Sequence, residues 1–455
     1  MTATEPAIAA PTEVRGFFGH PKGLYYLAFT EAWERFSYYG MTALLVLYMV
    51  NQLLLPGHVE NIAGFAAFRA VVEGVIGPLS TQALASQIFG FYSGLVYFTP
   101  VIGGFIADRW LGQRNAVVLG AALMSAGHMA MAFDQSFLLA LLLLIVGCGL
   151  LKGNISAQVG ALYALNDEAN RVRGFAIFSM AINVGSTAGP IVCGLLAQIY
   201  GWHVGFAAAA AFILIGLVTY LTGYRHLPAR IERGKTEARK LSSADWAKIG
   251  IICAILVITT FQSIAYFQSF NVAAIWVQEH VDLQLGAFTI PVPWFNSIDP
   301  IFSIAGVPVV FALWRWQADH GGEPGDLAKI GVGAWIAMAS NLVLVAAMVT
   351  SGGADVSPLW PLFYYGGLGF AFLFYWPTTL ALVSRAAPAP VNATMMGVAF
   401  LTLFIASFTI GWLGSFYEPI GPVAFWALHA AIAACGGLAV VLFGGVASRA
   451  LSREG

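Results

Sequence analysis

Charged residues are scarce in this sequence. Lys, Arg, Asp and Glu make up 9% of the 455 residues, whereas a soluble globular domain carries roughly 25%. The net charge is −1, so the chain has no basic field for nucleic acid. Its four cysteines are scattered through apolar stretches without CxxC spacing, which argues against a disulfide framework and against a metal site.

Long apolar runs dominate the rest. Hydrophobic residues make up 59% of the chain, and the mean hydropathy is +0.78. A membrane-spanning helix needs about 20 mostly apolar residues. Twelve such runs occur, at about 25–50, 86–107, 115–133, 136–158, 173–198, 203–223, 247–273, 298–316, 328–350, 358–384, 391–415 and 421–447. Barrel strands would alternate in polarity over ~10 residues, so we predict an all-α polytopic membrane protein.

The basic residues predict the orientation, because cytoplasmic loops are enriched in Lys and Arg. Of the 21 basic residues, Arg35 and Lys152 fall within spans and Arg69 falls opposite the termini, which leaves 18 on the side of the termini. Both termini are therefore expected in the cytoplasm. The N-terminus lacks the apolar run of a signal peptide and is expected to be a short cytoplasmic tail.

A basic segment divides the spans into six plus six. We expect a tail at 1–24, a bundle at 25–223, a cytoplasmic linker at 224–246, a second bundle at 247–447 and a tail at 448–455. Two parallel bundles of this kind are typical of transporters. The basic linker could also bind anionic lipid. The half-apolar loop 51–85 is expected to form an extracellular or interfacial helix, without an assigned function.

Charges inside the apolar runs are the main functional signal, because a charge in the bilayer normally faces a cavity or a partner. Glu31, Glu34 and Arg35 share one stripe of a helix. One arginine cannot neutralise two carboxylates, and Lys152 is the other embedded cation of the first half. A cluster of two acids and two bases could couple protons, since protonation of an acid frees its base. The alternative is a static salt-bridge network, although buried pairs often add no stability over apolar packing.

A turn motif follows the second apolar run. The stretch GGFIADRWLGQR at 103–114 places Gly104, Asp108, Arg109 and Arg114 at the cytoplasmic end of two helices. A glycine there permits close helix approach, the aspartate can cap or pair across the turn, and the arginines serve as inside anchors. We interpret these residues as part of conformational gating.

Together the motifs resemble one family. EAWERFSYYG at 31–40 is similar to the ExxERFxYYG motif of helix 1 in the proton-dependent oligopeptide transporters of the major facilitator superfamily. GGFIADRWLGQR resembles the loop motif of that superfamily, and FSMAINVGSTAGPIVCGLLAQIYGWHVGF the helix-5 signature. GLLKGNISAQVG resembles the helix-4 segment, with Gly153 in place of a proline, and FNSIDPIF the helix-8 segment.

The resemblance implies a major facilitator fold and proton-driven uptake of di- and tripeptides by alternating access across a bacterial inner membrane. It implies roles in proton coupling and substrate engagement for Glu31, Glu34, Arg35 and Lys152. Residues that line the peptide site of the family correspond here to Tyr38, Tyr39, Tyr97 and Asn183. No cofactor is expected besides the coupling proton, and a single chain is expected to work as a monomer in the lipid bilayer.

Four further positions depart from the family pattern. In the family, an arginine on helix 1 pairs with a glutamate on helix 7; here Thr42 replaces the arginine and Phe267 the glutamate. Because both charges are absent together, no unpaired charge is left buried. Phe372 stands where the family has a helix-10 glutamate that meets the amino group of the peptide. Asp299 replaces a helix-8 asparagine. We expect Asp299 to hold a substrate ammonium or to titrate as a proton site; the alternative is a helix cap ahead of Pro300.

Two other functions are alternatives to peptide transport. The missing acids favour, to a degree, a peptide-like or non-peptide solute carried by the same fold with the same proton coupling. A membrane enzyme would need a nucleophile with its base or a metal cluster. The eight histidines show no HExxH spacing and no GxSxG occurs, so we expect a transporter and not an enzyme.

Overall fold

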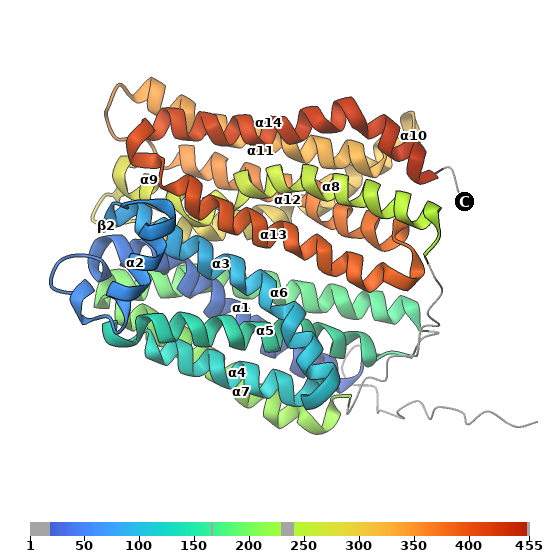
Figure 1. Cartoon of the computed structure of the whole chain (residues 1–455), viewed down its shortest axis with the longest axis horizontal. Helices are drawn as coiled ribbons and strands as arrows, with labels where there is room; N and C mark the ends of the chain where they lie inside the picture. Colours follow the sequence, from blue (N-terminus) through green and yellow to red (C-terminus); the bar gives the residue numbers. More distant parts are fainter. Residues whose placement is uncertain (1–18, 165–166, 229–240, 453–455) are drawn as a thin grey trace, which may run out of the picture.

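The computed structural model describes residues 19–164, 167–228 and 241–452. Its long helices form two bundles that lie side by side (Figure 1). The N-terminal bundle contains α1 (Lys22–Tyr48), α3 (Thr81–Ile106), α4 (Gln113–Ala130), α5 (Phe137–Ala161), α6 (Glu168–Tyr200) and α7 (Trp202–Gly223). The C-terminal bundle contains α8 (Ser243–Phe267), α10 (Ile298–His320), α11 (Asp326–Ser351), α12 (Leu359–Ala386), α13 (Asn392–Gly414) and α14 (Tyr417–Ser452).

Shorter elements connect these helices. They are α2 (Phe65–Ile76), α9 (Val272–His280) and an antiparallel hairpin of β1 (Gln284–Leu285) and β2 (Phe288–Thr289). Short 3-10 or π turns also occur: η2 (Met49–Leu53), η3 (Val59–Asn61), η4 (Ala107–Leu111), η5 (Asp134–Ser136), η6 (Tyr224–His226), η7 (Gln268–Phe270), η8 (Val292–Ser297) and η9 (Ala389–Val391). The helix predicted within 51–85 is α2.

All twelve predicted spans are helices, which confirms the fold class. By length and composition alone, ten of the described helices could cross a membrane, and α1 and α4 are not among these ten. The α1 helix carries three charges in its middle, and α4 begins with the polar run Gln-Arg-Asn. Both helices are nevertheless packed inside the N-terminal bundle, where α1 lies against α6 and α7, and α4 lies against α5 and α7.

The described chain begins and ends at the same end of the molecule. The start of α1 and the end of α14 lie opposite α2, α9 and the β-hairpin (Figure 1). This arrangement agrees with an even number of spans. The predicted tail 1–24 and linker 224–246 lie partly outside the described residues, as do residues 453–455 of the C-terminal tail.

Two serine caps explain where helices of each bundle begin, because the first backbone N–H groups of a helix lack intrahelical partners. The hydroxyl of Ser80 accepts a hydrogen bond from the N–H of Ala83 at 3.2 Å, at the start of α3. At the start of α8, Ser242 and Asp245 bond reciprocally, each side chain accepting from the backbone of the other. This second arrangement is a capping box.

Glycines let α6 approach α1 closely, and this contact positions the charged stripe of α1. A Cβ atom added to Gly185 would lie 2.9 Å from the Cβ of Arg35 and 2.9 Å from the N of Phe36. Between the bundles, a Cβ on Gly90 of α3 would lie 2.6 Å from the Cα of Gly411 on α13. Real Cβ atoms do not approach so closely, so these contacts require glycine.

Replacement of Gly185 with alanine tests the α1–α6 contact. Alanine ordinarily stabilises a helix relative to glycine by up to about 1 kcal/mol. At Gly185 we expect destabilisation by about 1–3 kcal/mol, since overpacking forces the backbones apart. Thermal unfolding in detergent measures the difference. Gly250→Ala, at an exposed helical glycine with open space around it, is the control and should not lower stability. Equal behaviour of both variants would contradict the close contact.

Candidate functional site

The charged stripe of α1 forms a buried ion group. The Nε atom of Arg35 lies 3.0 Å from Oε1 of Glu31 and also pairs with Glu34. The three residues are 0–3% exposed. The guanidinium also lies 5.4 Å from the ring centroid of Tyr38. The α-helical spacing of three and four residues brings the groups together, as the sequence predicts.

This ion group is incompletely satisfied within the described residues. Oε2 of Glu31, Oε1 of Glu34 and Nη2 of Arg35 are buried without a hydrogen-bond partner there. Two carboxylates and one guanidinium carry a formal charge of −1 when ionised. Buried charges are costly unless they are paired and hydrogen-bonded. The arrangement therefore differs from a fully satisfied structural salt bridge and leaves groups that a proton or a ligand can engage.

Lys152 lies on α5, but not in a direct ion pair with either glutamate in the described structure. Its Nζ atom lies 4.4 Å from the ring centroid of Tyr97 on α3, a cation–π contact. It remains within electrostatic reach of Glu31 and Glu34. The expected cluster of two acids and two bases is thus an ion group of three with a neighbouring cation, and this cation is half-buried.

Asp299 is the second residue of α10 and is 4% exposed. Its carboxylate accepts hydrogen bonds from the hydroxyl of Tyr266 on α8 and from that of Ser303, the latter at 3.3 Å. The N-cap position belongs to Ser297, and no side chain caps this helix. The capping alternative therefore lacks its hydrogen bond. Asp299 is instead an acid of the C-terminal bundle that two hydroxyl groups orient.

One row of aromatic rings connects the two charged centres. The ring centroids are 5.1 Å apart for Tyr38 and Tyr39, 6.3 Å for Tyr39 and Phe270, and 6.0 Å for Phe270 and Tyr266. Tyr266 then donates to Asp299. The rings run from α1 to Tyr266 on α8, and the hydrogen bond of Tyr266 extends the row to Asp299 on α10, so it crosses from one bundle to the other.

A second row starts at Lys152. The ring of Tyr97 lies 5.4 Å from that of Phe267, and Phe267 lies 5.4 Å from Tyr266. Phe372 stacks on Tyr266 at 5.4 Å. Phe267 and Phe372, which we expected at the positions of family acids, therefore both pack on the tyrosine that bonds Asp299. Sequence reasoning did not identify Tyr266, although it directly precedes Phe267.

Thr42 and Asn183 also fit their surroundings. The hydroxyl of Thr42 donates to the carbonyl of Tyr38 at 2.6 Å, so the residue leaves no orphan polar group. Asn183 is half-buried on α6 and precedes Thr187 by four residues on the same helix face. The carbonyl of Thr187 accepts from Ser297 at 2.7 Å. The face of Asn183 thus meets the segment that leads into Asp299.

In the turn motif at 103–114, the glycine in close helix contact is not the one that we expected. Open space surrounds Gly104, whereas a Cβ on Gly103 would lie 2.9 Å from the N of Leu150 on α5. The close approach therefore occurs one residue earlier than expected. Asp108 lies in the π turn η4 and accepts from the amide of Gln113 at 2.9 Å.

The two arginines of this motif differ in their environments. Arg109 is exposed, in keeping with an anchor at the end of the bundle. The guanidinium of Arg114 on α4 lies 4.8 Å from the ring centroid of Tyr224, the first residue of η6 directly after α7. Arg114 thus connects the start of α4 with the end of α7.

Several hydrogen bonds join the bundles at the end opposite the termini. The side-chain amides of Asn51 and Gln278 bond reciprocally at 2.8 and 2.9 Å. The amide of Gln198 donates to the carbonyl of Thr289 on β2 at 2.8 Å, and Ser80 bonds Glu418. The bundles are therefore held together on the side of α2, α9 and the hairpin.

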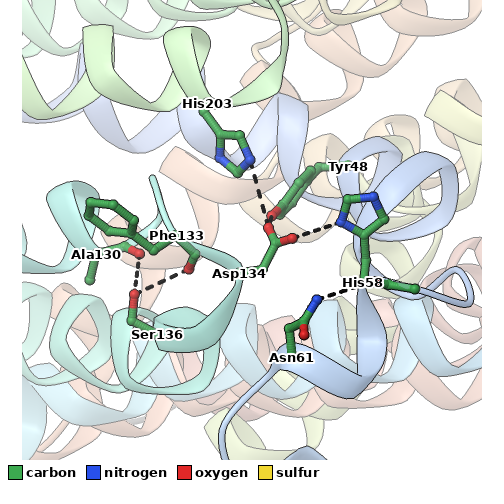
Figure 2. Close-up of polar contacts among 9 residues, drawn as sticks. Tyr48, His58, Asn61, Ala130, Phe133, Asp134, Ser136 and His203 are labelled. Atoms are coloured by element: carbon green, nitrogen blue, oxygen red, sulfur yellow. Dashed lines mark hydrogen bonds and ion pairs between the residues drawn. The ribbon is translucent and has the colours of Figure 1, made fainter.

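A polar cluster that the sequence did not predict lies at the same end (Figure 2). Asp134 accepts from the hydroxyl of Tyr48 at 2.5 Å and lies 2.8 Å from Nδ1 of His58 and 3.7 Å from Nε2 of His203. These side chains come from α1, the following loop, η5 and α7, so the cluster ties together the N-terminal bundle. The described part of the chain contains no group of three His, Cys, Asp or Glu side chains placed to hold a metal ion.

Comparisons with known proteins agree on one family. A family model described as "POT family" matches residues 114–247 and 235–420. The chain is 32% identical over 447 residues to "Uncharacterized transporter YclF" of Bacillus subtilis, covering 85% of this chain and 86% of that one. It is 28% identical over 473 residues to "Peptide transporter YePEPT" of Yersinia enterocolitica, covering 88% of each.

A solved structure has the same architecture. The crystal structure of a POT family transporter in complex with 5-aminolevulinic acid superposes with a TM-score of 0.82 at 25% identity. The match covers 96% of this chain and 99% of that chain.

Replacement of Arg35 with glutamine tests the ion group. It leaves Glu31 and Glu34 buried without their cation, which should destabilise the protein by about 3–5 kcal/mol. Thermal unfolding measures the loss, and the exposed Arg109→Gln should stay within about 0.5 kcal/mol of the wild type. If Arg35→Gln were as stable as the control, the guanidinium would not be balancing the two acids.

Proposed function

Because the chain belongs to the POT family, we propose that it imports di- and tripeptides together with protons by alternating access. The observation that carries the proposal is the buried ion group of α1, whose atoms are incompletely satisfied among the described residues. It faces an acid of the other bundle across rows of rings. With one of the two α1 acids protonated, a zwitterionic substrate would find a net positive charge from Arg35 and Lys152 at one end of this site and the anion Asp299 at the other.

The cationic end would bind the substrate carboxylate. Nη2 of Arg35 has no hydrogen-bond partner in the described chain, and Lys152 lies on a ring instead of pairing directly with an acid. A proton on Glu31 or Glu34 would remove one of the two ion pairs of Arg35 and let the guanidinium pair with the substrate carboxylate in its place. Release of that proton would restore the ion pair and favour substrate release. Proton and substrate would thus be coupled through one arginine.

The anionic end would bind the substrate ammonium at Asp299. The hydroxyl groups of Tyr266 and Ser303 already donate to this carboxylate and orient it, so its remaining lone pairs can accept from an ammonium. Tyr38, Tyr39, Tyr97 and Asn183 would line the space between the two ends. Aromatic walls suit varied peptide side chains, because rings offer large contact area at low entropic cost.

The cross-bundle bonds support alternating access. They hold the bundles together at the end opposite the termini, so the described state would open toward the termini. Gly104, Asp108, Arg109 and Arg114 lie at that other end and would act in gating. With both termini in the cytoplasm of a bacterial cell, the inside-negative potential contributes about 2.3 kcal/mol per proton per 100 mV. The proposal requires no cofactor and treats one chain as the working unit.

A related cargo is the second candidate. Phe267 and Phe372 pack where the resemblance implies acids, so among the described residues Asp299 is the acid of the C-terminal bundle that meets these rings. The related transporter bound to 5-aminolevulinic acid shows that a POT protein binds a small non-peptide amino acid. Uptake of dialanine, trialanine and 5-aminolevulinic acid into liposomes separates the candidates, and transport of the last compound alone would favour the second.

Proteoliposome uptake under an imposed proton gradient tests the coupling. Glu34→Gln removes an acid and Lys152→Ala removes a cation, and each should lower gradient-driven dialanine uptake by about tenfold or more. Glu168→Gln and Lys22→Ala, at exposed helix starts, are matched controls and should transport as the wild type does. Normal uptake with intact proton dependence in both site variants would refute the coupling proposal.

Asp299→Asn tests the ammonium subsite. The amide keeps the size of the side chain but loses the charge, so the KM for dialanine should rise about tenfold while the pH profile of uptake keeps its shape. Asp319→Asn, an exposed acid on the same helix, is the control. A shifted pH profile with unchanged KM would make Asp299 a proton site, and unchanged behaviour in both would remove it from transport.

A further inference from the structure

A groove on the C-terminal bundle lies apart from the proposed transport site. It runs between α10, α11 and α12 and has a volume of about 370 Å³. Val307, Phe311, Leu373 and Ala381 are among the apolar residues that line it. Phe311 is 56% exposed, so in a membrane this groove opens toward lipid.

Four charges gather where the groove ends, on the side of the termini. Lys329 pairs with Glu323, and Arg385 pairs with Asp326. Lys329 is 8% exposed, and its Nζ atom lies 3.8 Å from the ring centroid of Trp314, inside the groove. The cluster holds two cations and two anions, and Lys329, Arg385 and Asp326 belong to the groove lining.

The balance of charge limits the class of occupant. An anionic headgroup would be repelled by Glu323 and Asp326 as well as attracted by the cations. A zwitterionic headgroup matches both signs, because its phosphate can lie on Lys329 and Arg385 while its ammonium lies on the acids.

We propose that the groove binds one aminophospholipid of the phosphatidylethanolamine type from the leaflet on the side of the termini. Its acyl chain lies against Phe311 and Leu373, and its headgroup lies on the four charges. The primary ammonium donates hydrogen bonds to Asp326 and Glu323, which a choline headgroup cannot do because its nitrogen carries no N–H. The site therefore distinguishes ethanolamine from choline lipids. Lipid binding here does not depend on the cargo or on the proton coupling.

Native mass spectrometry of the purified protein tests the proposal. The protein is mixed with equimolar phosphatidylethanolamine, phosphatidylcholine and phosphatidylglycerol of the same acyl chains. We expect one phosphatidylethanolamine to be retained at about fivefold higher occupancy than either other lipid. Equal retention of the three lipids, or preference for phosphatidylglycerol, would overturn the proposal.

Two variants locate the site. Ala381→Trp fills the groove from an exposed position, and Lys329→Ala removes a cation; each should lower phosphatidylethanolamine retention about fivefold. Ala427→Trp places the same bulk on an exposed position of α14 outside the groove and should retain the lipid. Lys329 is buried, so Lys329→Ala can lose the lipid simply because the protein unfolds. Ala381→Trp changes an exposed residue and therefore tests the site independently of that effect. Wild-type retention by Ala381→Trp would place the lipid elsewhere and refute the assignment.

Discussion

The burial of Arg35 between two glutamates is the constraint on which the rest of the structure depends. Three charges in the interior of a membrane protein must be held close together, since each is costly alone. Helical spacing on α1 supplies the acids, and Gly185 lets α6 close over the same residues. The set retains one negative charge in excess when all groups are ionised, so it remains responsive to protons and to nearby cations.

The second bundle contributes a further acid. Tyr266 and Ser303 orient Asp299 through hydrogen bonds, and a row of aromatic rings lies between Asp299 and α1. Phe267 and Phe372 pack on Tyr266, so the two positions at which the resemblance implies acids carry an aromatic surface. A site with cations on one bundle and an acid on the other can respond when the bundles move relative to each other.

The sequence predicted much of this arrangement because its signals are local. Apolar runs determine the twelve helices, and the spacing on α1 determines the ion group. Contacts between helices that are separated in the sequence could not be predicted from residue spacing. The position of Lys152 on Tyr97 depends on how α5 meets α3, and close packing at Gly103 instead of Gly104 depends on a helix rotation of one residue. The Asp134 cluster joins four separate segments, so no spacing in the sequence could reveal it.

The central claim is that a proton on the α1 acids frees Arg35 to bind the substrate. It is tested most directly by counting protons taken up when a transported solute binds, using calorimetry in buffers of different ionisation enthalpy. The account predicts uptake of about one proton per bound substrate near neutral pH, which is lost when Glu31 and Glu34 are both changed to glutamine. Binding without proton uptake in the wild-type protein, or uptake that persists in the double variant, would contradict it.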